Sequence, residues 1–301
     1  MLTLPFNKPG QFYKGNLHTH STLSDGRLTP EAVCRVYQEA GYHFLSITDH
    51  FLSAYNFPLT DTRSFHIGDF TTLIGAELHA GYTELGNLWH ILAVGLPLTF
   101  EPPTEGETGP QIAARALNTG AYVAVAHPQW YTLTEGDVLS LGPVHAIEVI
   151  NGTSHDHNDK IDSWYMMDMM LARGHRYTAC ATDDAHFNAA RGDVFLGWVQ
   201  VKSETLDPEV ILAALKAGSY YSSTGPEIYD VQVFPKEKII VRCSPAERIF
   251  ATGKGWTAVS AYGNGLFGAE LNIEKFDSPY GRIVVRDAKG GRAWSNPFWF
   301  E

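Results

Sequence analysis

The chain has few cysteines and no long hydrophobic run, and both absences exclude classes of protein. Its 301 residues include only three cysteines, which form no CxxC pair and lie far apart at Cys34, Cys180 and Cys243. This spacing indicates neither a disulfide framework nor a zinc knuckle. No apolar run approaches the roughly 20 residues that cross a bilayer, and the segment 1–10 lacks the apolar core of a signal peptide. We therefore expect a cytoplasmic protein that does not enter a membrane.

Positive charge is also scarce, since 22 lysines and arginines face 33 aspartates and glutamates for a net charge of −11. Surfaces that bind DNA or RNA are usually basic, so a nucleic-acid partner is not expected. An anionic substrate would need local positive charge, which bound metal ions can supply.

Apolar runs alternate with amphipathic segments over the first two thirds of the chain. Strands are expected near 12–17, 44–48, 70–75, 88–94, 121–126, 144–150, 176–181 and 194–201, and helices near 30–40, 111–119, 158–173 and 208–217. This alternation predicts a parallel sheet. At least six strands before residue 205 favour closure into a barrel, and the long loops favour a distorted one.

The pattern changes at about residue 222, where helices of usable length give way to short strands separated by Gly and Asp turns. We read this region as a small β-sandwich. The expected fold class is therefore α/β, with a distorted barrel over residues 1–222 and a small all-β domain over residues 223–301.

Histidines and carboxylates recur at the ends of the predicted strands. His18 and His20 lie two residues apart, so on a strand both point to the same side. The candidate metal ligands are His18, His20, Asp25, His50, Glu77, His90, His127, Asp184 and His186. Any one of them alone could be a satisfied core residue, but in a barrel the carboxyl ends of the strands meet on one face. Such a cluster is costly to bury unless two or three divalent cations bind it, and imidazole with carboxylate suits Zn, Mn or Fe.

Six ordered motifs between residue 12 and about residue 205 resemble the PHP (polymerase and histidinol phosphatase) superfamily of metal-dependent phosphoesterases. They are Asn16-Leu-His18-Thr-His20 with Asp25, Ile47-Thr-Asp-His50, Gly75-Ala-Glu77, His90, Ala126-His127-Pro128 and Asp184-Ala-His186. The resemblance implies a distorted (β/α)7 PHP barrel with a trinuclear metal centre. Asp25 stands where some members have histidine, and either residue can bind a metal.

The resemblance also implies three ligand sets and a mechanism. The sets are His18, His20, Glu77 and Asp184 for one ion, Glu77, His90 and His127 for a second, and Asp25, His50 and His186 for a third. A hydroxide held between the two ions that share Glu77 would attack the substrate, and the third ion would polarise substrate oxygens. The catalytic residues would be Asp184, Glu77 and His186, with Asp184 placed to take the proton.

The C-terminal region carries a narrower resemblance, to the carbaryl-hydrolase-like branch of this superfamily. Its motifs are Ser223-Thr-Gly-Pro226, Cys243-Ser-Pro-Ala246 and Ala293-Trp-Ser-Asn-Pro297. That branch includes carbamate-ester hydrolysis as well as phosphoester hydrolysis. We regard these motifs as structural, so they do not decide the substrate.

Three functions are therefore open. The first is a phosphoesterase acting on a small phosphate monoester or diester, the second is a carboxyl- or carbamate-ester hydrolase, and the third is a non-catalytic metal-binding module. Candidate substrate contacts are Arg27, Asn151, His155 and Arg191. The aromatic residues Phe51, Tyr55, Trp130 and Tyr131 could line an apolar pocket that suits a diester or an aryl ester. The expected partner is a small molecule, and the oligomeric state is left open.

Overall fold

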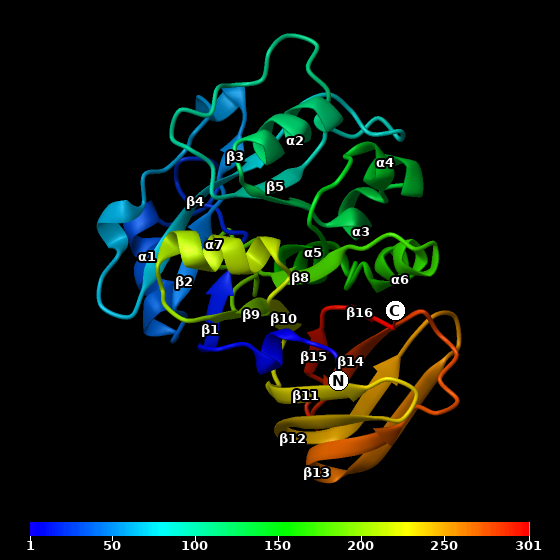
Figure 1. Ribbon diagram of the computed structural model, residues 1–301. Coiled ribbons are helices and arrows are strands. Elements are labelled where there is room, and N and C mark those ends of the chain that lie inside the picture. The colour runs from blue at the N-terminus through cyan, green and yellow to red at the C-terminus, as the bar shows by residue number, and fades with distance from the viewer. Residues whose placement is uncertain (301) are drawn as a thin grey trace.

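A computed structural model describes residues 1–300 and shows a mixed α/β fold (Figure 1). The helices are α1 (Pro30–Glu39), α2 (Gly109–Asn118), α3 (Pro128–Tyr131), α4 (Glu135–Ser140), α5 (Gly152–Asn158), α6 (Trp164–Ala172) and α7 (Pro208–Lys216), with short 3-10 helices at Pro5–Asn7, Ser53–Tyr55 and Arg63–Phe65. The strands up to the C-terminal region are β1 (Gln11–Asn16), β2 (Phe44–Ile47), β3 (His50–Phe51), β4 (Thr71–Leu78), β5 (Ile91–Val94), β6 (Tyr122–Val125), β7 (Ala146–Asn151), β8 (Thr178–Thr182), β9 (Trp198–Ser203) and β10 (Tyr220–Ser223).

The strands that carry the predicted ligands follow the order β10-β9-β1-β2-β4-β5-β6-β7-β8 in one sheet. The predicted parallel pairing is correct for β1 with β2, β2 with β4, β6 with β7 and β7 with β8. It is wrong for β5, which runs antiparallel to β4 and β6, and for β9, which runs antiparallel to β1 and β10. No helix lies between β4 and β5, and a chain without a crossover helix returns antiparallel. The antiparallel pairs β5 with β6 and β9 with β10 do have a helix between them, α2 and α7, so the expected link between an intervening helix and a parallel pair fails there.

The sheet curls around a buried apolar cluster that includes Leu92 of β5, Tyr122 of β6, Val199 of β9 and Tyr220 of β10. Its last strand, β8, contacts β10 through side chains of β10, and the Tyr220 hydroxyl donates to the Thr178 hydroxyl at 2.7 Å. The Ser222 hydroxyl donates to the carbonyl of Ala179 at 2.7 Å and accepts from the amide of Ala181 at 3.1 Å. The result is a curled mixed sheet, and the regular alternation of a (β/α)7 barrel is not shown.

Local sequence explains where the helices begin and end. Thr29 caps α1 by accepting from the Ala32 amide at 3.3 Å, and Pro30 takes the first helical position. The helix predicted over 158–173 begins later, at Trp164 of α6, and α5 lies before the predicted span, where no helix was expected. Asn151 caps α5, and Asp159 ends it in the left-handed conformation at φ +58°. The start of α5 therefore lies directly after β7, beside the carboxyl end of the sheet.

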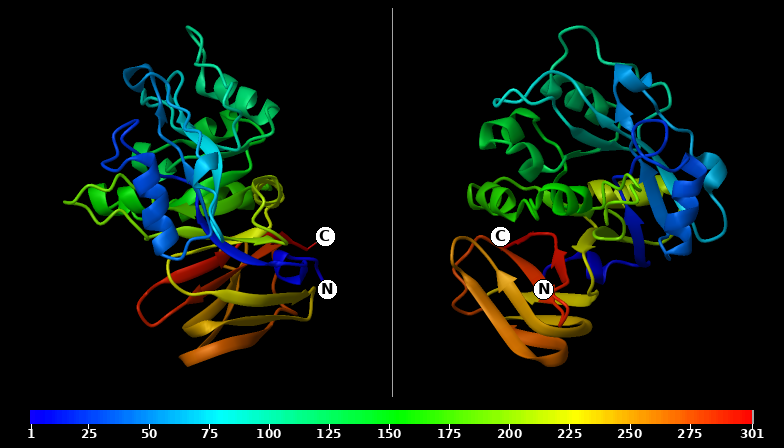
Figure 2. Two further views of the ribbon diagram at one scale, coloured as in Figure 1. Left: turned by 90° about the vertical axis from the view of Figure 1, so that its left-hand side faces the viewer. Right: turned by 180° about the vertical axis from the view of Figure 1, so that it is seen from behind.

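The C-terminal region contains strands and no helix within the described residues. Its strands are β11 (Ile228–Phe234), β12 (Lys238–Thr252), β13 (Ala258–Asn272), β14 (Tyr280–Arg286), β15 (Arg292–Ser295) and β16 (Phe298–Trp299). They surround a second apolar cluster and lie on one side of the α/β region (Figure 2). The two regions share a continuous sheet, because β15 pairs with both β14 and β10. The division at residue 222 and the sandwich architecture stay predictions.

Candidate metal centre

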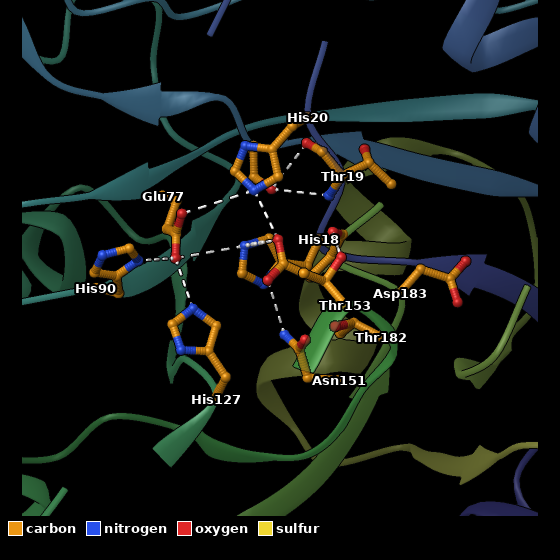
Figure 3. Close-up of polar contacts among 12 residues, drawn as sticks. His18, Thr19, His20, Glu77, His90, His127, Asn151, Thr153, Thr182 and Asp183 are labelled. Atoms are coloured by element: carbon orange, nitrogen blue, oxygen red, sulfur yellow. Dashed lines mark hydrogen bonds and ion pairs between the residues drawn. The ribbon is translucent and has the colours of Figure 1, made fainter. Parts of the chain in front are cut away.

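The structure brings all nine candidate ligands together at one end of the curled sheet. Seven of them lie at or after the carboxyl end of a strand, as the sequence predicts, whereas His90 directly precedes β5 and Asp25 lies in the loop before α1. Groups of potential ligand atoms within 4.8 Å of one another include every one of the nine. Figure 3 shows four of the histidines, His18, His20, His90 and His127, around Glu77.

Glu77, near the end of β4, is the centre of the cluster. Its Oε1 lies 2.7 Å from His90 Nδ1 and 2.9 Å from His127 Nε2. The same oxygen is 3.6 Å from His18 Nε2. Its Oε2 lies 2.6 Å from His50 Nδ1 without the geometry of a hydrogen bond. One buried carboxylate therefore faces imidazoles from four different segments.

Asp184 forms a second focus, after β8. Its Oδ1 lies 2.8 Å from His20 Nε2 and 3.2 Å from His18 Nε2, while its Oδ2 accepts a 3.1 Å hydrogen bond from the Asn151 amide. The backbone of Asp184 has φ +53°, and His127 has φ +25°. Such conformations cost about 1–3 kcal/mol in a residue other than glycine and are concentrated at functional sites.

Asp25 marks the open edge of the cluster, since its side chain is 40% exposed. Its Oδ1 lies 3.4 Å from His186 Nε2, 3.6 Å from His50 Nε2 and 3.9 Å from His20 Nδ1. The side chains of His50 and His186 are partly exposed, whereas those of His18 and His20 are fully buried. A substrate can therefore reach the cluster from the Asp25 side.

The observed groups only partly match the ligand sets implied by the resemblance. Asp25, His50 and His186 do form one group, but His20 joins it. The other groups are His50, Glu77, His79 and His90; His18, His127 and Asp184; and His18, His20 and Glu77. Because the groups overlap, proximity alone does not decide how the ligands divide among ions.

The side chains fit divalent cations. His18 Nε2 and Glu77 Oε2 are buried and have no hydrogen-bond partner within the described residues. Unpaired buried polar atoms cost free energy, and a cation between them removes that cost. Imidazole and carboxylate donors without thiolate suit Zn, Mn or Fe.

Mutual electrostatics keeps the carboxylates ionised. Burial alone would raise the pKa of Glu77, but the imidazoles of His90, His50 and His18 lower it well below its usual range. Burial also works to raise the pKa of Asp184, and nearby histidines, His18 foremost, outweigh it and lower that pKa. Both carboxylates are therefore ready to bind cations at neutral pH.

The histidines divide into two kinds. Burial opposes a charged His18 ring, but the carboxylates of Asp184, Glu148 and Glu77 raise its pKa well above the usual value. Burial, with the rings of His186 and His50, lowers the pKa of His20 to about 4. Metal binding requires neutral imidazole, so cations would displace the proton from His18 but meet none on His20.

Two buried residues that the sequence analysis missed support the ligands. Glu148 of β7 accepts from His18 Nδ1 at 2.9 Å and from the His127 amide at 2.6 Å, and it contacts Asn151 at 3.0 Å. His79 follows β4 and contacts His50. The sequence held a signal for both residues. Glu148 is a single acid inside an apolar run, and His79 lies two residues after Glu77, the same spacing that separates His18 from His20.

The candidate substrate contacts lie in different places. Asn151 reaches the cluster through Asp184. His155 is exposed and lines a cavity of about 270 Å³ together with Arg292 and Trp294, and none of the nine candidate ligands lines that cavity. Arg27 is exposed and Arg191 is half-buried. Among the aromatic candidates, the Tyr131 hydroxyl lies 2.9 Å from His90 Nε2, and Tyr55 stacks near His50 with ring centroids 6.2 Å apart.

Comparisons with known proteins support the fold. No family model matches the chain. A two-domain protein from Bacteroides vulgatus, described as containing a predicted PHP-like metal-dependent phosphoesterase, shares 14% identity at a TM-score of 0.53, with 93% of each chain covered. An amidohydrolase from Chromobacterium violaceum shares 16% identity at a TM-score of 0.44, over 57% of this chain and 87% of its own. The first similarity shows a mixed α/β fold that the two proteins share.

One curated relative was found by sequence. An uncharacterized protein of Methanocaldococcus jannaschii is 28% identical over 113 residues, which make up 37% of this chain and 44% of that protein. The chain therefore matches less than half the length of this relative. Separately, no helix within the described residues is both long and apolar enough to cross a membrane.

Proposed function

We propose that the chain is a metal-dependent hydrolase that cleaves a small phosphate monoester or diester. The observation that carries this proposal is Glu77, a fully buried carboxylate whose two oxygens face histidines from separate segments. A carboxylate in that position can bridge two cations. The fold shared with the PHP-like protein of Bacteroides vulgatus supports the proposal.

The proposed centre holds two or three Zn, Mn or Fe ions in the sets implied by the sequence resemblance. His18, His20, Glu77 and Asp184 would hold the first, and His90 and His127 would join Glu77 at the second. Asp25, His50 and His186 would hold the third, at the exposed edge. The group formed by Asp25, His50 and His186 supports the last assignment most directly.

The side chains have separate tasks in this proposal. Bound cations would lower the pKa of water and neutralise charge that develops on the substrate. Asp184 faces the buried histidines with one oxygen and Asn151 with the other, so it can orient water and accept its proton. Glu77 keeps the buried imidazoles in place, and His186 lies at the open edge where substrate enters.

Hydrolysis of a carboxyl or carbamate ester, as in the carbaryl-hydrolase-like branch, is the second candidate. One observation favours it: the lysine next to the α3 segment, Lys160, donates to the Trp130 carbonyl at 2.7 Å instead of facing the cluster. The nearby Tyr131 is neutral at neutral pH, as tyrosines ordinarily are, and burial together with the charge of Glu77 raises its pKa further, to about 12. A neutral aromatic edge suits an aryl ester better than a doubly charged phosphate.

The finer architecture is proposed on the same grounds. We infer a distorted (β/α)7 barrel over residues 1–222 and a β-sandwich over residues 223–301. The curled sheet and the apolar C-terminal cluster support this division. A small-molecule partner and a cytoplasmic location stay predictions.

Metal-loaded protein distinguishes the candidate functions. We expect Mn- or Zn-loaded protein to hydrolyse p-nitrophenyl phosphate or its bis-ester, and metal-free protein to be inactive. Hydrolysis of 1-naphthyl esters or carbamates alone would instead establish the second candidate. If metal binds and no substrate is cleaved, the chain is a metal-binding module and the proposal is wrong.

Replacement of Asp184 tests the assigned site. Asp184→Asn should lower turnover by about 1000-fold or more, because losing one group that stabilises transition-state charge already costs about 100- to 1000-fold. The matched control is Asp277→Asn, at an exposed position in the C-terminal region. Near-normal activity of a folded Asp184→Asn variant would contradict the assignment.

A further inference from the structure

His79 is a buried histidine beside the cluster to which the proposed ligand sets give no role. Its side chain is fully buried, and its Nε2 lies 3.7 Å from Glu77 Oε2. The ring also packs against His50 and His90, with centroids 4.9 and 4.3 Å away. It makes two hydrogen bonds, one to a backbone carbonyl and one to another histidine.

These two hydrogen bonds determine where the ring protons lie. His79 Nδ1 lies 2.8 Å from the Trp89 carbonyl oxygen, which can only accept, so Nδ1 carries a proton. In a neutral ring the other nitrogen, Nε2, is then an acceptor. His50 Nδ1 lies 2.9 Å from it and must be the donor. The Nε2 of a neutral His50 is left with a free lone pair.

That lone pair faces the open edge of the cluster. His50 Nε2 lies 3.6 Å from Asp25 Oδ1, within the group that also contains His186. A histidine that binds a metal through one ring nitrogen usually donates the N–H of the other to a carboxylate, a carbonyl or water. Here a neutral histidine takes the place of that acceptor.

We propose that His79 is a positioning residue that fixes the tautomer of His50, so that His50 presents its Nε2 to a cation held with Asp25 and His186. This inference depends on the metal centre proposed above but not on the substrate. It also gives His79 a second effect. His50 Nδ1 is 2.6 Å from Glu77 Oε2. Because His79 accepts the hydrogen bond from His50 Nδ1, that carboxylate oxygen is left without a hydrogen bond and is available to cations.

The alternative is that His79 binds a cation itself. Its Nε2 belongs to a group with Glu77, His50 and His90. In that case His50 Nδ1 would lose His79 as its hydrogen-bond acceptor and would have to donate to Glu77 instead. The two arrangements differ in which histidine nitrogens touch metal.

NMR of the wild-type protein separates them without any substitution. Protein with isotope-labelled histidine nitrogens is loaded with an NMR-active cadmium isotope. We expect cadmium–nitrogen coupling at His50 Nε2, none at His79, and a proton on Nδ1 of both rings. Coupling at His79, or a proton on His79 Nε2, would overturn the proposal.

Two variants test the consequence for binding. His79→Leu removes the acceptor and should weaken binding of one ion about 10- to 100-fold. His79→Gln keeps an acceptor and a donor on one amide, so it should restore binding to near the wild-type level. The matched control is His145→Leu, which removes a partly buried histidine that bonds the Val123 amide on β6. It should leave metal content unchanged.

Metal titration against a fluorescent chelator, with elemental analysis, gives the readout. If the wild-type protein binds no metal, the proposed function itself fails. If the wild type binds metal and His79→Leu binds it equally well, only the role of His79 is wrong. Equal losses in His79→Leu and His79→Gln would point to direct ligation by His79 and also overturn the proposal.

Discussion

The α/β region and the C-terminal region of this chain both bury apolar side chains, but the α/β region also buries a cluster of ionisable ones. The first encloses carboxylates and histidines, with Glu77, His18 and His20 completely inaccessible. In the second, within the described residues from 223 on, the buried polar or charged side chains are Ser223, Arg282 and Ser295. Arg282 is paired with Asp168 at 3.0 Å, and its guanidinium stacks on Trp164.

This difference separates two uses of burial. The C-terminal cluster is stabilised by apolar packing, in which each side chain lowers the free energy of the fold. Burying the polar cluster raises the free energy of the folded state unless a ligand binds the buried polar atoms. His18 Nε2 and Glu77 Oε2, which have no hydrogen-bond partner, are two such atoms. The substitutions below test whether stability depends on the C-terminal cluster and metal binding on the polar cluster.

The largest stability effect is expected in the C-terminal cluster. Ile249 of β12 is fully buried there, so Ile249→Ala should lower the free energy of unfolding by about 2–5 kcal/mol. Chemical denaturation measures the loss, with Tyr229→Ala at an exposed position as the control. Metal content of the folded protein should not change. A drop in metal content would show that the regions are not independent.

A smaller effect, on binding, is expected from the support of the ligands. Glu148→Gln keeps the shape of the side chain but removes one of the two oxygens that accept from His18 and the His127 amide. Metal affinity should fall about 10- to 100-fold, as is typical when a supporting partner of a ligand is lost. Competition with a chelator measures it, and Glu270→Gln, in the exposed pair with Lys238, is the control. Unchanged affinity would remove Glu148 from the site.

The smallest effect is a pH dependence of the metal-free protein. Burial opposes a charged His50, but Glu77 and Asp25 raise its pKa to about 10. The stability that this proton contributes is fully present below the unfolded pKa of about 6.5 and is lost as pH rises through about 10. The melting temperature of chelator-treated protein should therefore fall by a few degrees between about pH 7 and 10.

The control for this pH dependence is His50→Gln, which should show a shallower decline over the same range because it lacks the titrating ring. Metal-loaded protein should also lose the dependence, since bound cations require neutral imidazole. Parallel curves for the wild type and His50→Gln would contradict the assignment.

The sequence predicted the membership of the cluster better than its arrangement. Histidines at strand ends could be recognised because strand ends of an α/β fold meet, whatever the exact pairing. The antiparallel direction of β5 was missed although no helix is expected between the strands near 70–75 and 88–94, because the alternation of strands and helices elsewhere was taken to hold for this pair as well. The division of ligands among ions was likewise out of reach, because Glu77 and His20 each belong to more than one set of neighbours.

The pairing of β15 with β10 has a consequence for how the chain would respond to cleavage. The two strands are joined at Tyr221 to Ser295, Ser222 to Trp294 and Ser223 to Ala293, although more than 60 residues separate them along the chain. A protease cutting between β10 and β11 would therefore not release the last quarter of the chain. The two fragments would stay bound edge to edge, and a nicked protein would keep both its shape and its polar cluster.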